Sequence, residues 1–308
     1  MKETKKFDLL ILGGGISGMT AGIFSALANI KTTIIEERVC GGLANWTNTI
    51  VNFPSHISIN GMELMERILE QVENLGVKVD QAAEIERLNI TDKIKIVETD
   101  ETIYEGDAII IATGRQPIRL NLETDFERIH YCSVCDGSAY AGKKVLVIGG
   151  GNSGFDESLY LLSLGVNEII MIEALENCCA SESTQAKLCD YPNVSIKTST
   201  FVKEIKKNLN GCCVTIENQK SMKIDMINVD GIFVFIGQHA NTQLFRNIID
   251  IDETGYIITG TNCETSVLGV YAAGDVTRKN FRYLTTAMAD GTIAGLAAAK
   301  YIKENREF

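Results

Sequence analysis

The chain is poor in proline, histidine and tryptophan, and its basic residues are outnumbered. It has 308 residues with 3 Pro, 3 His and 1 Trp, and 29 Lys and Arg stand against 40 Asp and Glu, a net charge of -11. Nucleic acids and anionic membranes both bind basic surfaces, so neither is an expected partner. A hydrophobic content of 45% is not that of a disordered chain. The acidic surface is expected mainly to provide solubility, although it could steer a basic partner.

Long apolar runs are also missing. No segment approaches the roughly 20 apolar residues of a membrane span. The run Phe7–Leu12 is too short for the core of a signal peptide, and glycines follow it instead of a cleavage site. The sequence therefore predicts a cytoplasmic protein.

The cysteines do not form the pattern of a secreted disulfide framework. There are 9 of them, an odd number. One Cys-x-x-Cys pair is present, Cys132 and Cys135, so a four-cysteine zinc site would lack its second half and no metal site is predicted. A single such pair in an intracellular chain is typical of redox chemistry.

The first half of the chain contains a strand, a glycine-rich turn and a helix in the order that binds dinucleotides. The apolar run Phe7–Leu12 leads into Gly13, Gly15 and Gly18, and a later strand over residues 32–35 ends at Glu36. In this motif the first glycine makes a tight turn and the second lets the backbone approach a pyrophosphate. The third lets helix and strand pack closely, while the acid bonds a ribose hydroxyl.

The same pattern returns in the middle of the chain. An apolar strand over 145–148 leads into Gly149, Gly151 and Gly154, and the next strand, 168–172, is followed by Glu173. Each acid follows its third glycine at close to the roughly 20 positions that the motif requires. One glycine motif is weak evidence, but two in the correct context indicate two dinucleotide-binding units.

The expected fold is α/β, with two Rossmann-like (three-layer ββα) domains, the second inserted in the first. Alternating segments near 85–96 and 202–216 predict antiparallel meanders, and 285–302 predicts a final helix rich in Ala and Gly. Segments 114–118 and 237–242 are the expected hinges. The predicted domains are 1–115 and 244–308 for FAD, and 116–243 for an NAD(P)H-binding-like domain that carries the Cys-x-x-Cys pair.

Seven short motifs occur in one order along the chain. They are Gly13–Gly18, Gly41–Gly42, Val51–Pro54, Ala112–Gly114, Cys132–Gly137, Gly149–Gly154 and Gly269–Asp275. In this order the chain resembles the low-molecular-weight thioredoxin reductases. The Cys-x-x-Cys-Asp-Gly sequence just before the second glycine loop is the most specific element, because glutathione-reductase-type enzymes carry their cysteine pair near the N-terminus.

The resemblance implies a homodimer that holds FAD with its first and last segments. Gly13, Gly15 and Gly18 would meet the pyrophosphate, and Glu36 the adenosine ribose. The other implied FAD residues are Gly42 and Asn52 toward the flavin, Thr113 and Gly114 in the Ala-Thr-Gly motif, Asp275 at the ribityl and phosphate region, and Arg282 and Tyr283 near the isoalloxazine.

The resemblance also assigns roles to the redox pair. Cys135 would face the flavin, Cys132 would exchange with a thioredoxin-like protein, and Asp136 would shuttle protons during thiol release. His130 could tune the pKa of Cys132, or it could be an ordinary hydrogen-bonded histidine.

The chain departs from the family where the electron donor would bind. NADPH-using members carry an arginine cluster after the second strand, whereas this chain reads Ile-Glu-Ala-Leu-Glu-Asn-Cys-Cys over 172–179. NADPH is therefore not the expected donor, since its 2′-phosphate would meet acids without arginines to offset them. NADH is possible, with Glu173 as ribose ligand and Gly149, Gly151 and Gly154 at its pyrophosphate.

A second donor stays open, because Tyr283 stands where NADPH-using enzymes usually have glutamine and could cover the flavin. Electrons would then arrive from ferredoxin, as in some clostridial relatives. Two rivals of other classes are a flavin redox sensor or binding module that no longer turns over, and a peroxide-forming oxidase.

Overall fold

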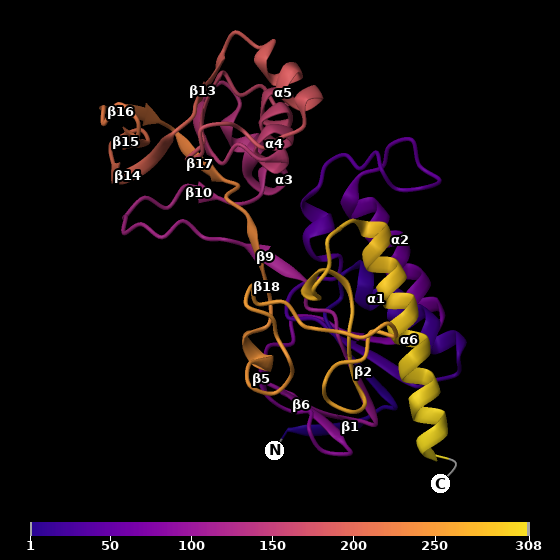
Figure 1. Cartoon of the computed structure of the whole chain (residues 1–308). Helices are drawn as coiled ribbons and strands as arrows, with labels where there is room; N and C mark the ends of the chain where they lie inside the picture. The colour runs from indigo at the N-terminus through magenta and orange to yellow at the C-terminus, as the bar shows by residue number, and fades with distance from the viewer. Residues whose placement is uncertain (1, 307–308) are drawn as a thin grey trace. The chain divides into compact units, whose positions relative to one another are not determined.

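The protein is described by a computed structural model that covers residues 2–306, and this part of the chain divides into two compact units. Unit 1 is made of residues 2–116 and 239–306, and unit 2 of residues 117–238 (Figure 1). Unit 2 is thus inserted in unit 1, as the sequence predicted.

The centre of unit 1 is a parallel sheet with strand order β19-β8-β2-β3-β4. Its strands are Val270–Ala272, Ala108–Ile111, Leu9–Leu12, Thr32–Ile35 and Lys78–Asp80. Three helices, α1 (Ile16–Leu27), α2 (Gly61–Asn74) and α6 (Leu284–Arg306), pack on it, and the last, yellow in Figure 1, runs beside α1.

A second, four-stranded sheet forms the third layer of unit 1. Its order is β1-β7-β6-β5, over Glu3–Lys6, Thr102–Gly106, Lys95–Thr99 and Ile85–Asn89. Successive side chains of a strand point to opposite faces. In β2, Leu9 and Ile11 accordingly join the core under the helices, while Leu10 and Leu12 join the core under the second sheet. Burial on both faces explains why this strand is continuously apolar.

Unit 2 repeats the three layers. Its parallel sheet has the order β10-β17-β11-β12-β13, over Ile129–His130, Gly231–Val234, Lys144–Ile148, Glu168–Ile172 and Val194–Lys197. Val145 and Val147 of β11 pack in the core that includes residues of α4 (Asn152–Ser163) and α5 (Glu182–Cys189). Leu146 and Ile148 pack against the antiparallel meander of β14 (Thr200–Lys207), β15 (Cys212–Asn218) and β16 (Ile224–Val229).

Short elements complete the two units. The helix α3 (Ser133–Asp136) and the 3-10 turn η2 (Gly137–Tyr140) follow β10, and η1 (Gly42–Trp46), η3 (Gln243–Phe245) and η4 (Gly274–Val276) belong to unit 1. The chain passes between the units through β9 (Arg115–Pro117) and β18 (Gln238–Ala240), which pair with each other.

The chain returns from unit 2 to unit 1 after residue 238, earlier than the predicted domain boundary at residue 243. Residues 239–243 belong to unit 1. Asn241 explains this placement: its side chain donates to the carbonyl of Thr113 at 2.8 Å, and its own carbonyl accepts from the Thr113 hydroxyl at 2.8 Å. Such bonds between residues 128 positions apart leave no mark on local sequence.

Within residues 2–306, no helix is both long and apolar enough to cross a membrane.

Candidate redox and dinucleotide sites

The first glycine loop has open backbone at the start of α1. Gly13 has φ of +103°, where a Cβ would lie 2.4 Å from the Ala112 carbonyl oxygen, and a Cβ on Gly18 would lie 2.0 Å from the Gly13 carbonyl oxygen. Gly15 caps the helix without any side-chain hydrogen bond, and a Cβ there would have nothing within 4 Å. The first-turn N–H groups therefore face space that an anion can occupy.

Glu36 is held against this loop. Its Oε2 accepts from the Gly14 N–H at 2.6 Å, and its Oε1 accepts from the Arg38 N–H at 2.9 Å. Both bonds fix the carboxylate at the end of β3. Cys40 packs on the same glycine, and burial raises its pKa to about 12, so it is a neutral packing thiol.

Several buried polar atoms of unit 1 have no hydrogen-bond partner among the described residues. They are Ser17 Oγ in the first turn of α1, Asn45 Oδ1 in η1, Asp275 Oδ1 in η4 and Arg282 Nε. Buried polar groups are normally satisfied, so a set of orphans around one loop is what a bound polar ligand would leave when removed. Donors and acceptors of this kind fit the phosphates, ribityl chain and polar ring edge of FAD.

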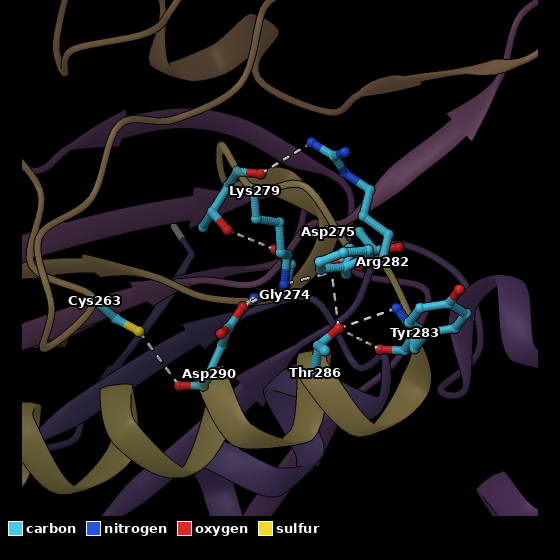
Figure 2. A network of polar contacts seen from close by, with 10 residues as sticks. Cys263, Gly274, Asp275, Lys279, Arg282, Tyr283, Thr286 and Asp290 are labelled. Atoms are coloured by element: carbon cyan, nitrogen blue, oxygen red, sulfur yellow. Dashed lines mark hydrogen bonds and ion pairs between the residues drawn. The ribbon is translucent and has the colours of Figure 1, made fainter. Parts of the chain in front are cut away.

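The loop from Gly274 to Tyr283 is fixed on α6 by a polar network (Figure 2). Asp290 of α6 accepts from the Gly274 N–H at 3.0 Å and from Lys279, whose ammonium lies 4.0 Å from Asp275 Oδ1. Thr286 of α6 accepts from the Tyr283 N–H at 3.0 Å. The pKa of Asp275 is raised by burial, against the opposing charges of Lys279, Arg115 and Arg282.

The guanidinium of Arg282 lies over the ring of Tyr256, 4.0 Å from the ring centroid, and Tyr283 is 54% exposed.

The other predicted FAD residues lie in turns of unit 1. Thr113 and Gly114 follow β8, both bond to Asn241, and Gly114 has a φ of +63°. Gly42, with φ of +57°, lies beside the Gly15 position, and Asn52 is exposed in the segment between η1 and α2.

The second glycine loop is built like the first. Gly149 has φ of +115°, a Cβ on Gly154 would lie 2.0 Å from the Gly149 carbonyl oxygen, and Gly151 caps α4 with no side-chain bond and nothing within 4 Å. Glu173 Oε2 accepts from the Gly150 N–H at 2.6 Å and its Oε1 from the Leu175 N–H at 2.8 Å. The two acids thus make equivalent bonds to their loops.

Cys132 and Cys135 form a disulfide at the start of α3 in unit 2. Cys132 is 6% exposed, and its sulfur accepts from the Cys135 N–H at 3.0 Å, whereas Cys135 is exposed. A backbone N–H aimed at a sulfur stabilises the thiolate after reduction. The favoured thiolate is therefore that of Cys132.

Two titratable groups flank the pair. Asp136 Oδ2 lies 3.2 Å from Nδ1 of His130, on the strand before the disulfide. Glu157 of α4 is largely buried, and burial raises its pKa to about 7, although the nearby Ser133 hydroxyl partly opposes the shift. Among the described residues its Oε2 has no partner with hydrogen-bond geometry.

Sequence reasoning missed Glu157, Asn45 and the pair formed by Lys279 and Asp290. Glu157 lies three positions after Gly154 on the helix that follows the glycine loop. A carboxyl three positions after the buried Gly154 and four before the buried Leu161, on the same helix face, was the signal that could have identified it.

The family model described as pyridine nucleotide-disulphide oxidoreductase matches residues 7–291. The chain is 31% identical to the thioredoxin reductase of Bacillus subtilis over 100% of this chain and 98% of that protein. It belongs to this oxidoreductase family, within the low-molecular-weight thioredoxin reductases. The chain is therefore an oxidoreductase, as the sequence predicted.

Two further likenesses span the same length. A 34.2 kDa protein in the rubredoxin operon of Clostridium pasteurianum is 38% identical over 98% of this chain and 99% of its own length. The crystal structure of Lactococcus lactis thioredoxin reductase aligns with a TM-score of 0.90 and 31% identity, over 97% of this chain and 99% of that one. The two-domain Rossmann-like fold is confirmed by this similarity.

Proposed function

We propose that the chain is an FAD-dependent thioredoxin-disulfide reductase, which passes electrons to Cys132–Cys135 and on to a thioredoxin-like protein. The observation that carries the proposal is the disulfide of the Cys-x-x-Cys-Asp sequence, which precedes the second glycine loop in the chain. Relatives that share this length of chain are named thioredoxin reductases.

FAD would be held by unit 1. Gly13, Gly15 and Gly18 would meet its pyrophosphate with the N–H groups of α1, and Glu36 would accept from the adenosine ribose. Asp275 Oδ1 and Arg282 Nε, which lack a hydrogen bond among the described residues, suit the remaining polar groups of the cofactor. When bound, FAD would supply a two-electron carrier between the donor and the disulfide.

The chain's own groups account for the thiol chemistry. After reduction, the Cys135 N–H favours the thiolate at Cys132, which supports Cys132 as the sulfur that attacks the partner's disulfide. Cys135 would then be the sulfur reduced from the flavin side. Asp136, held beside the pair, would accept and return the thiol proton.

We infer that NADH is a better electron donor than NADPH. The equivalence of Glu173 and Glu36, each bonded to its own glycine loop, supports a carboxylate that receives a free ribose hydroxyl. A 2′-phosphate at this position would face the charge of Glu173, with no Lys or Arg between residues 173 and 181 to offset it.

A protein electron carrier such as ferredoxin is the second candidate donor. The exposed Tyr283 supports it, because an aromatic ring beside Arg282 could cover the flavin against a nicotinamide. The relative named for a rubredoxin operon supports it as well.

Substitution of Cys135 by serine tests the main proposal. We expect Cys135→Ser to lose turnover of thioredoxin-like substrates by more than about 10²-fold, because the disulfide cannot form, while the flavin absorbance band is retained. Cys179→Ser, at an exposed cysteine, is the matched control and should keep full turnover. Full activity in Cys135→Ser would contradict the mechanism. If the wild-type protein binds flavin tightly but shows no thiol–disulfide exchange with any dithiol partner, the hypothesis of a flavin redox sensor is favoured.

An anaerobic titration of the oxidised protein with NADH and, separately, NADPH tests the donor. Bleaching of the flavin band by NADH alone is expected, and Glu173→Ala should slow it, whereas Glu176→Ala should not. Reduction by ferredoxin with no response to either nucleotide would overturn the NADH proposal and favour the protein donor.

We also propose that the protein acts in the cytoplasm as a homodimer, as its resemblance to this family implies. Sedimentation of the flavin-loaded chain at twice the monomer mass is the expected result.

A further inference from the structure

His130 lies in the middle of a three-residue chain of polar contacts that runs from Tyr140 to Asp136, and Asp136 directly follows Cys135 in the sequence. Its Nδ1 lies 3.2 Å from Asp136 Oδ2, and its Nε2 lies 2.6 Å from the hydroxyl of Tyr140. Its side chain is 17% exposed, and its ring stacks on Phe233 and against the edge of Tyr140. Packing on both sides therefore fixes the plane of the imidazole.

The chemistry of the two partners determines the tautomer. An ionised carboxylate only accepts hydrogen bonds, so Nδ1 must carry the proton that is donated to Asp136. Nε2 of the neutral ring is then an acceptor, and the Tyr140 hydroxyl donates to it. Tyr140 is 2% exposed, and burial raises its pKa, so its hydroxyl keeps its proton.

The ring is neutral near pH 7. Burial lowers the pKa of His130, Asp136 opposes that shift, and Arg128 adds to it. The other charged or titratable groups around the contact chain are Lys143, over the Tyr140 ring at 5.4 Å, and Asp230 and Cys212, which act on Tyr140. The side chain of Asp136 is 41% exposed, and its carboxylate lies against the packed imidazole of His130, a contact that can hold it in one orientation next to Cys135 in the chain.

We propose that His130 is a positioning residue for the thiol–disulfide chemistry, acting through Asp136. This inference rests on the proposed role of Asp136 as the group that takes and returns the thiol proton. In that step the Cys132 thiol transfers its proton to Asp136, and the resulting thiolate forms a mixed disulfide with one sulfur of the attacked disulfide. The S–S bond of that disulfide breaks, and its other sulfur departs as a thiolate to which Asp136 can return the proton. The donation from Nδ1–H keeps the carboxylate where it can take the proton.

Four full-length, flavin-containing proteins test the proposal: wild type, His130→Gln, Asp136→Asn and the double variant. Each is reduced with dithiothreitol, freed of reductant, and mixed with the small disulfide 5,5′-dithiobis(2-nitrobenzoate). The rate of thiolate release is followed from pH 5.5 to 8.5. This assay needs neither the physiological donor nor the protein partner, so it remains informative even if the reductase proposal fails.

We expect His130→Gln to slow exchange about tenfold and the double variant to be no slower than Asp136→Asn, because one group acts through the other. His130→Asn, whose amide can replace the Nδ1–H donor, should recover most of the rate and flatten the acid limb of the pH profile. His56→Gln is the control histidine and should match wild type.

Two outcomes would overturn the proposal. Additive losses in the double variant would mean that His130 acts on the cysteines directly. An unchanged rate and pH profile in His130→Gln would show that His130 has no part in the exchange. Equal losses of rate in His130→Gln and His130→Asn, together with a lowered melting temperature, would show that His130 acts only through packing.

Discussion

At the scale of single residues, the buried carboxyl of Glu157 has the clearest consequence for stability. Burial raises its pKa to about 7, against a reference of 4.5, so the folded protein holds this proton more tightly than the unfolded chain. Between these two values the folded state binds more protons, and stability must fall as pH rises through the interval.

Glu157→Gln removes this pH-dependent cost. We expect the variant to gain stability over wild type as pH rises from 5 to 8, by on the order of 2–3 kcal/mol at most, because a neutral amide need not be ionised in a buried site. Denaturant unfolding at pH 5, 6.5 and 8 measures it. Glu182→Gln, at the exposed start of α5, is the control. A difference that does not vary with pH would contradict the expected titration of Glu157.

At the scale of elements, the close packing of α6 on α1 determines where the first glycine loop lies. A Cβ on Gly291 would lie 2.2 Å from the carbonyl oxygen of Ser17, and one on Gly295 would lie 2.7 Å from that of Ala21. Both contacts are with backbone, which cannot move aside cheaply. The helix is rich in Gly and Ala because larger side chains would separate the two helices.

Gly291→Ala should therefore force α6 away from the first turn of α1. We expect a loss of about 1–3 kcal/mol of stability from overpacking, together with weaker FAD retention, since Ser17 lies in that first turn. Thermal unfolding and the flavin content of the purified protein measure both effects. Lys300→Ala, on the exposed side of the same helix, is the control. Normal flavin content with unchanged stability would show that the helices separate without strain.

At the scale of the whole molecule, ion pairs in unit 1 join the end of α6 to the starts of two strands of the central sheet. Arg306 at the end of α6 pairs with Asp8, just before β2, and with Asp107, just before β8, at 2.8 Å. The pKa of Asp8 is lowered: burial alone would raise it, but hydrogen bonds from Arg306 and the Lys31 N–H outweigh that effect. The pair therefore stabilises the fold above the ordinary aspartate pKa and loses this effect as pH falls below it.

Arg306→Gln should lower the melting temperature of the protein by only a few degrees near pH 7, because partly exposed pairs contribute about 0.2–1 kcal/mol each. The difference should shrink in high salt, and also as pH falls below the ordinary aspartate pKa, because Asp8 then takes up a proton. Scanning calorimetry across salt and pH measures it, with Lys303→Gln as control. A deficit that persists in 1 M salt would mean that packing of the arginine stem matters more than its charge.

Local sequence determined much of this protein. The two glycine loops, the strands 32–35 and 168–172 and the long final helix are all present in the structure, because tight turns, buried strands and amphipathic helices each depend on neighbouring residues. The Cys-x-x-Cys pair was equally visible, since its chemistry needs only two cysteines at fixed spacing. The roles of the individual FAD and NADH residues remain predictions.

Tertiary structure alone decided what depends on residues far apart in the chain. Asn241 bonding to Thr113 set the return of the chain to unit 1, and Asp290 bonding to Gly274 fixed the loop of Asp275. The burial of Glu157 and the fixed tautomer of His130 likewise arise from packing between separate elements. Proton affinity and hydrogen-bond direction depend on solvent exclusion and facing partners, and these exist only once the chain has folded.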